Sequence, residues 1–284
     1  MAPHPFSIEE WGTRRSLAIA PIPSMSIIAT GILFVCFLFA GILLCIELGK
    51  RLGKARFSKE GESATTGISA IEGAVFGLLG LTLAFLFSGA LSRFDERRKI
   101  ITQECNDIGT AWLRVDLLPV DTQPAMRDLF RRYLDSRIET YRKLPDLDAA
   151  KVELQRSAEL QSKIWTLAVS STQGTGTSHP PMLLLPALNS MFDTATLRTE
   201  ASKMHPPIVI TAMLAVLALA SSLFAGYDMA NRRPWLSLHP IAFALVLSVT
   251  VYVIIDLEYP HLGMIQVKNS EEILIGLRDS MNTK

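Results

Sequence analysis

The chain has 284 residues, and its formal net charge of +1 gives no reason to expect a nucleic-acid partner. Apolar residues make up 49% of the chain and charged residues only 19%. Residues 25–46 contain no charged side chain, and a water-soluble fold seldom needs such a long apolar run. The composition therefore argues against a soluble enzyme and predicts an all-α integral membrane protein.

Four apolar windows are long enough to cross a bilayer core, which requires roughly 20 residues. They cover residues 25–46, 72–92, 207–227 and 238–256. The first is followed by Glu47, Lys50 and Arg51 rather than by a cleavage site, so we interpret it as a retained anchor. The predicted organisation is an N-terminal tail (1–24), a first transmembrane hairpin (25–92), a helical extramembrane domain (93–206), a second hairpin (207–257) and a C-terminal tail (258–284).

The distribution of basic residues leaves the orientation of these spans open. The short links between spans carry Lys and Arg, and so do the segments that precede span one and follow span two. The rule that short cytoplasmic loops are basic favours cytoplasmic links, whereas the raw count leans the other way. Four spans place both termini on the same side of the membrane in either case.

The second span is rich in small residues and runs into a helix with a heptad pattern. Gly73 and Gly77 form a GxxxG motif, which is common where helix backbones pack closely. We predict one helix of about 45 residues from this span onward. The sequence allows two packing partners for the seam of this helix: other helices of the same chain, or the same helix of other copies across an oligomer axis. The seam residues are Leu91, Phe94, Arg98, Ile101, Cys105, Ile108, Trp112 and Val115.

Residues that would indicate catalysis or metal binding are poorly arranged in this sequence. It has no Gly-x-Ser-x-Gly, no phosphate-binding loop of the Walker type and no His-Glu-x-x-His. The five histidines are scattered, and the three cysteines lie in apolar segments that suit packing. We therefore predict no enzyme activity, no catalytic residue, no metal site and no cofactor.

Three segments resemble the bestrophin-like family of bacterial membrane proteins. The first is the glycine-rich second span running into Ala90–Arg98, and the second is Glu104–Arg114 with Asn106, ending at Pro119. The third is Asp256–Gly263, which contains Pro260. Asn189, Asp193 and Arg198 are weaker matches. The resemblance covers about residues 25–270, and it implies a multi-pass protein of the bacterial inner membrane.

The resemblance also implies a function, because true bestrophins are pentameric anion channels whose second span lines the pore. By that analogy the chain is an oligomer, a pentamer, embedded in membrane lipid and conducting chloride-type anions passively. Leu79, Leu83 and Phe87 are then the candidate pore neck, and Arg93, Arg97 and Arg98 the candidate anion vestibule. Ordinary helix packing and membrane-flanking anchors are the alternative roles for these side chains.

A second function of a different class stays open at this point. The helical domain between the spans would also suit a non-conducting scaffold or signalling subunit that recruits a protein partner. The span centres carry no acid or base, which argues against a proton-coupled carrier and is compatible with both readings.

Overall fold

The computed structural model describes residues 25–60, 68–172, 179–231, 238–259, 264–265 and 267–282, and within these ranges every regular element is a helix. The predicted tail at 1–24 lies outside them. The all-α prediction is confirmed. The α-helices are α1 (Met25–Glu60), α2 (Ile68–Arg114), α3 (Gln123–Arg142), α4 (Leu147–Thr172), α5 (His179–Ala201), α6 (Ile208–Asp228), α7 (Leu238–Glu258) and α8 (Lys268–Ser280), with short 3₁₀ turns η3 (Val115–Leu117) and η4 (Met229–Asn231).

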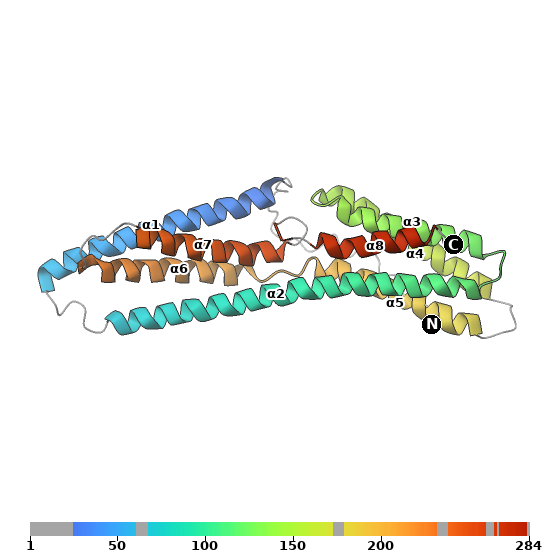
Figure 1. The fold of residues 1–284 in the computed structure, drawn as a ribbon, viewed down its shortest axis with the longest axis horizontal. Helices are drawn as coiled ribbons and strands as arrows, with labels where there is room; N and C mark the ends of the chain where they lie inside the picture. Colours follow the sequence, from blue (N-terminus) through green and yellow to red (C-terminus); the bar gives the residue numbers. More distant parts are fainter. Residues whose placement is uncertain are drawn as a thin grey trace, which may run out of the picture.

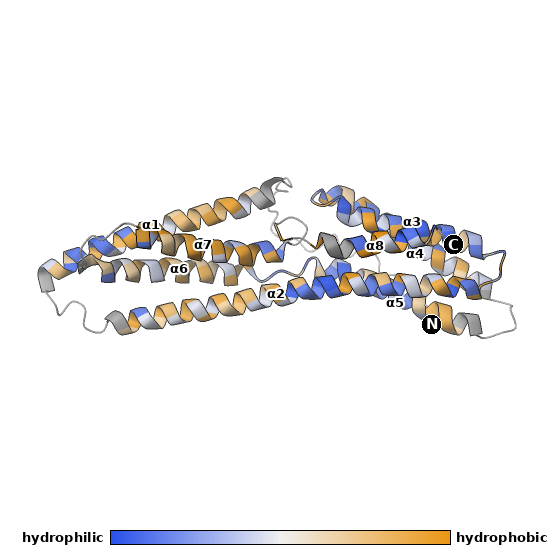
Figure 2. Ribbon diagram, viewed as in Figure 1, coloured by the Kyte–Doolittle hydropathy of each residue, from blue (hydrophilic) through white to orange (hydrophobic). Residues whose placement is uncertain are grey.

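The molecule is elongated, and α2 runs along its length as one continuous helix (Figure 1). At one end α2 lies with α1, α6 and α7, and at the other end with α3, α4, α5 and α8. Figure 2 shows that the first end is mainly hydrophobic and the second mixed. We call them the apolar half (α1, residues 68–92, α6 and α7) and the polar half (residues 93–117, α3, α4, α5 and α8).

Four helices are long and apolar enough to cross a membrane, and they overlap the four predicted windows. They are Ala29–Ser58, Ala70–Leu117, Ile208–Asp228 and Leu238–Glu258. Large apolar side chains such as Phe37, Leu44 and Val246 point outward from them. Such an outward-facing surface would be costly in water and suits lipid.

Glycines bring α1 and α6 into backbone contact inside the apolar half. A Cβ atom added at Gly226 would lie only 2.0 Å from the carbonyl oxygen of Ile46, and one at Gly49 only 2.1 Å from that of Leu223. Gly53 is similarly crowded by Tyr227 and Ala230. Small residues of this kind let helices in a membrane approach closely enough for extensive van der Waals contact.

The heptad seam of α2 packs within its own chain in the polar half. Phe94, Ile101, Cys105, Ile108, Trp112 and Val115 are all buried in one hydrophobic core together with residues of α3, α4, α5 and α8. Leu91 and Arg98, which are also on the predicted seam, stay exposed. The intrachain alternative therefore accounts for the seam beyond residue 93, apart from Arg98.

Candidate functional site

The junction between the two halves is built around the guanidinium group of Arg97. Its Nε donates a hydrogen bond to the Ala201 carbonyl at 3.2 Å, and its two terminal nitrogens donate to the carbonyls of Met204 at 2.7 Å and Glu258 at 3.2 Å. These carbonyls lie at the end of α5, in the connection that follows it and at the end of α7. Helix ends leave carbonyls without intrahelical partners, so one buried cation satisfies the termini of two helices.

Arg93 completes this junction from one turn earlier on α2. It forms an ion pair with Glu258, whose side chain is buried, and its Nε lies 3.0 Å from Oε1 of that carboxylate. Asp256 accepts hydrogen bonds from the backbone N–H groups of Met264 at 2.9 Å and Ile265 at 2.8 Å. The end of α7 is thus tied both to α2 and to the segment that follows it.

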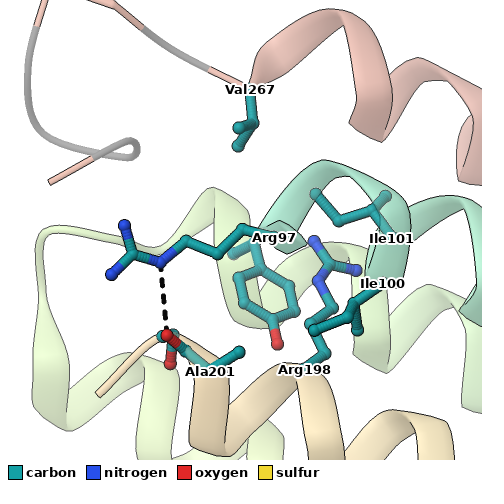
Figure 3. A pocket seen from close by; sticks show the side chains of 8 residues that line it. Arg97, Ile100, Ile101, Arg198, Ala201 and Val267 are labelled. Atoms are coloured by element: carbon teal, nitrogen blue, oxygen red, sulfur yellow. Dashed lines mark hydrogen bonds between the residues drawn. The ribbon is translucent and has the colours of Figure 1, made fainter. Parts of the chain in front are cut away.

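A small cavity of about 10 Å³ lies beside this junction, which is close to the room that one water molecule needs. Figure 3 shows the guanidinium groups of Arg97 and Arg198 on opposite sides of it, with that of Arg97 directed toward Ala201. The two cations therefore do not converge on one point in the cavity. The lining residues are Arg97, Ile100, Ile101, Tyr141, Arg198, Ala201, Ser202 and Val267.

A buried charge cluster lies deeper in the polar half, where one carboxylate meets two guanidinium groups. Glu104 is fully buried, with Nε of Arg137 at 2.6 Å from Oε1 and a terminal nitrogen of Arg198 at 2.7 Å from Oε2. Arg198 also stacks over the ring of Tyr141, 3.5 Å from its centroid. Burial alone would raise the pKa of Glu104, but the two arginines outweigh it and lower that pKa.

One face of α2 has no neighbouring element among the described residues, and in the apolar half it carries small side chains. Gly73, Gly77 and Gly80 are exposed, and a Cβ atom added at any of them would meet no other atom within 4 Å. Ala70, Ala84 and Ser88 continue this line. In the polar half the same face is polar, with Asp95, Lys99, Thr102, Asn106 and Thr110. We call the whole surface the open face of α2.

The three neck candidates do not share one surface. Leu79 is buried in the core of the apolar half, Leu83 is half-buried, and only Phe87 is exposed on the open face. Two steps of four residues turn an α-helix by about 80°, which separates the first side chain from the last.

The three vestibule candidates also separate. Arg97 is buried at the junction, Arg93 is paired with Glu258, and Arg98 is 55% exposed beside Asp95. Of the three, Arg98 is thus the one whose charge faces outward on the open face.

The family-motif residues fall into structural and exposed groups. Glu104 and Asp256 hold the buried contacts described above, and Arg114 donates to the carbonyl of Leu183, which ties α2 to α5. Asn106 is exposed on the open face. Pro260 and Gly263 lie outside the described residues.

Sequence reasoning missed Arg137, which pairs with Glu104, and the bond from Arg93 to Glu258. The available signal was that α3 carries an arginine on its apolar face, since Tyr133, Leu134 and Tyr141 surround Arg137 at helical spacing. Because a charged side chain is almost never buried unless it is paired, an arginine within this apolar stripe indicates a buried acidic partner.

A family model described as the Bestrophin-like domain matches residues 31–271 of this sequence. The chain belongs to the bestrophin-like family. The bestrophin-like chain is also similar in fold to the crystal structure of a bacterial bestrophin homologue from Klebsiella pneumoniae, a point mutant. The two share 14% sequence identity at a TM-score of 0.52, over 84% of this chain and 98% of that one. A comparison with curated proteins found no match.

Family membership and the four apolar helices together identify a multi-pass membrane protein. At 14% identity the structural similarity concerns the fold alone. What this bestrophin-like chain does has to be argued from its own side chains.

Proposed function

We propose that this protein is a passive ion channel of the bacterial inner membrane, formed by several copies around an axis lined by α2. In this proposal the apolar half spans the bilayer and the polar half lies outside it. Small anions are the permeant ions and five is the number of copies, both by analogy with bestrophins. The open face of α2 carries the proposal, because it runs the length of the molecule and no described element of the chain covers it.

The side chains along the middle of this face suit a conduit with one narrow section. Gly77, Ala84 and Leu91 follow one another at steps of seven, which keeps them on nearly the same line of the helix. Leu81 is exposed beside that line and is bulkier than the alanine and the glycine. Leu81 is our candidate for the constriction, whereas Leu79 is buried in the subunit and Phe87 lies at the edge of the face, about 120° around the helix from Leu81. Apolar constrictions of this kind gate conduction in channels.

The vestibule proposal rests on Lys99, which points outward from the middle of the open face, whereas Arg98 lies at its edge. The side chain of Lys99 is 75% exposed, and the contact of its ammonium group with Glu96 is long, at 4.0 Å. Rings of Lys or Arg favour anions in pores, because like charges repel cations and attract counter-ions. Asp95 and Glu96 lie next to these cations, so the proposed selectivity for anions is modest.

Ion flux from liposomes containing the purified protein tests this function. We expect chloride efflux above that of protein-free vesicles, with Lys99→Glu lowering the ratio of chloride to sodium permeability and Leu81→Ala raising total flux. Leu33→Ala is the matched control, since Leu33 is equally exposed but lies on α1. An assembled wild-type protein that leaves the vesicles sealed would reject the channel.

The second candidate is a non-conducting scaffold that recruits a protein partner, and one surface favours it. At the end of the polar half farthest from the apolar helices, large apolar side chains are exposed on neighbouring segments: Leu117 and Val120 after α2, and Met182 and Leu183 at the start of α5. Exposed apolar clusters outside a membrane are typical of protein-binding surfaces. Val120→Glu with Met182→Glu would then abolish co-purification of a stoichiometric partner and leave ion flux unchanged.

A further inference from the structure

We infer that neighbouring copies pack flank to flank along α2, with the Leu78–Phe85 side of one copy against the Gly73–Gly80 side of the next. The inference rests on the proposed assembly of several copies, and it adds which surfaces meet. It concerns the two edges of the open face, whereas the proposed conduit uses its middle.

The glycines of α2 give the first reason. Three other glycines, Gly49, Gly53 and Gly226, mark direct backbone contact between helices, whereas Gly31 on α1 and Gly276 on α8 have no neighbouring atom within 4 Å of an added Cβ. Gly73 and Gly80 have no such contact with the described residues, although glycine inside a helix is less favourable than alanine. The exposed faces of α1 and α7, by comparison, carry large side chains such as Phe37, Leu44 and Leu245. A row of glycines allows a second helix to pack closely against the surface. A surface that contacts only lipid does not require such a row.

The two edges are complementary in shape and in spacing. Leu78 and Phe85 lie seven residues apart on one edge and are both exposed, the latter by 69%. Gly73 and Gly80 lie seven residues apart on the opposite edge. In parallel helices, Leu78 of one copy lies level with Gly80 of the next, within about 3 Å along the axis at 1.5 Å per residue. Large side chains on one edge can therefore fill the spaces that the glycines leave on the other.

The charges on the same two edges are complementary as well. Glu96 continues the Leu78–Phe85 edge, and Arg98 continues the glycine edge, again two residues apart. Residues i and i+2 point to different sides of an α-helix, so these two cannot pair within one copy. Both are more than half exposed, and their contacts on their own helix are long, at 4.0 Å from Glu96 to Lys99 and 3.7 Å from Arg98 to Asp95. When two copies pack with α2 parallel, Glu96 of one copy lies at nearly the same height as Arg98 of the next, so the two side chains can form an ion pair.

Two unlike edges on one face favour a closed ring over a pair. A two-fold dimer joins a surface to its own copy, whereas a heterologous contact joins different surfaces and closes into a ring when the rotation allows it. The acidic, bulky edge and the basic, glycine edge form such a heterologous contact. Both edges of every copy are then used.

Cysteine cross-linking tests the contact directly in the full-length protein. In a background with Cys36, Cys45 and Cys105 replaced by alanine, the double variant Leu78→Cys plus Gly80→Cys should oxidise into a ladder of covalent oligomers ending at the ring size. Each single variant should stay uncross-linked, and so should a control pair on α1, Leu44→Cys plus Leu48→Cys, whose side chains are also exposed. Cross-linking that stops at dimers, or that needs only a cysteine at position 77, would overturn the heterologous contact.

Charge exchange gives a second, independent readout. Glu96→Arg alone and Arg98→Glu alone should each shift the detergent-solubilised particle toward monomer, and the two together should restore the oligomer. The matched control is Glu139→Arg plus Arg142→Glu, an exposed pair on α3 in the polar half. A restored ring without ion flux would reject the channel and keep the contact, whereas ion flux without a ladder or charge rescue would reject the contact alone.

Discussion

In the apolar half, α1 and α6 meet through glycines that bring backbone atoms together, whereas in the polar half the helices meet around buried ion pairs. The first contact requires glycines, which have no side chain, and the second requires acidic and basic side chains that pair. Inside a lipid bilayer there is little hydrophobic drive between helices, so close approach has to supply the attraction. In the polar half, a buried carboxylate with two arginines specifies one arrangement of α2, α3 and α5, because any other arrangement leaves charges unpaired.

The largest effect should come from filling a glycine contact in the apolar half. Gly226→Leu places carbon atoms where the Ile46 carbonyl oxygen lies, and we expect no folded protein. Gly77→Leu is the matched control, since a Cβ atom there meets no described atom within 4 Å. The yield of monodisperse protein and its thermal unfolding in detergent measure the difference. If both variants fold equally well, α1 and α6 are not in the close contact described.

The counterpart in the polar half is Glu104→Gln, which leaves two buried arginines without their carboxylate. We expect a loss of about 3–5 kcal/mol in the free energy of unfolding, as for other broken buried pairs. Glu139→Gln removes an exposed pair with Arg142 and should change the stability by less than about 0.5 kcal/mol. Denaturant titration of both variants against the unaltered protein gives these values. Equal losses would mean that Glu104 is not the anchor of its cluster.

At the junction between the halves, a smaller effect is expected from Arg97→Lys. Lysine keeps the charge but cannot reach all the carbonyls that the guanidinium group serves, so about 1.5–3 kcal/mol of charged hydrogen bonding is lost locally. Hydrogen exchange at the ends of α5 and α7 should become faster. Arg98→Lys, one position further on, should leave that exchange unchanged because its side chain is exposed.

The parts of this fold that could be predicted from the sequence are those set by local pattern. The four apolar runs, the length of α2 and its continuous heptad seam follow from hydropathy and from the helical period, and the helices appear where these patterns predict them. The same period explains why the three neck candidates separate. Steps of four look like one stripe but drift around the helix, so Leu79 turns inward while Phe87 turns outward.

The contacts that define the site could not be predicted, because they join residues far apart in the chain. The partners of Arg97 lie 104 to 161 residues away, and Arg198 lies 94 residues from Glu104. The heptad pattern places Arg98 on the seam and Arg97 beside it, yet Arg97 is buried and Arg98 is exposed. Which face of a helix turns inward is decided by the neighbours, and a single sequence does not name them.

The smallest expected effect is the dependence of folding stability on pH, in which the buried carboxylate of Glu104 differs from exposed carboxylates. The pKa of Glu104 is lowered from its ordinary value of 4.5 in the folded protein, so the unfolded chain binds the proton first as the pH falls. The stabilisation by Glu104 is therefore fully present above that value and is lost as the pH falls below it, at up to about 1.4 kcal/mol per pH unit. Glu153 has a lowered pKa as well, because Lys143 binds its carboxylate, and it adds a slope of the same sign.

Two variants separate these contributions. Glu153→Gln should retain the part of the acid slope that comes from Glu104, whereas Glu104→Gln should lose it and keep the part from Glu153. Thermal unfolding between pH 7 and pH 3 in one detergent measures both slopes. If Glu104→Gln were as sensitive to acid as the unaltered protein, the two arginines would not be holding the carboxylate in its charged form, and the fixed position of α3 against α2 and α5 would need another cause.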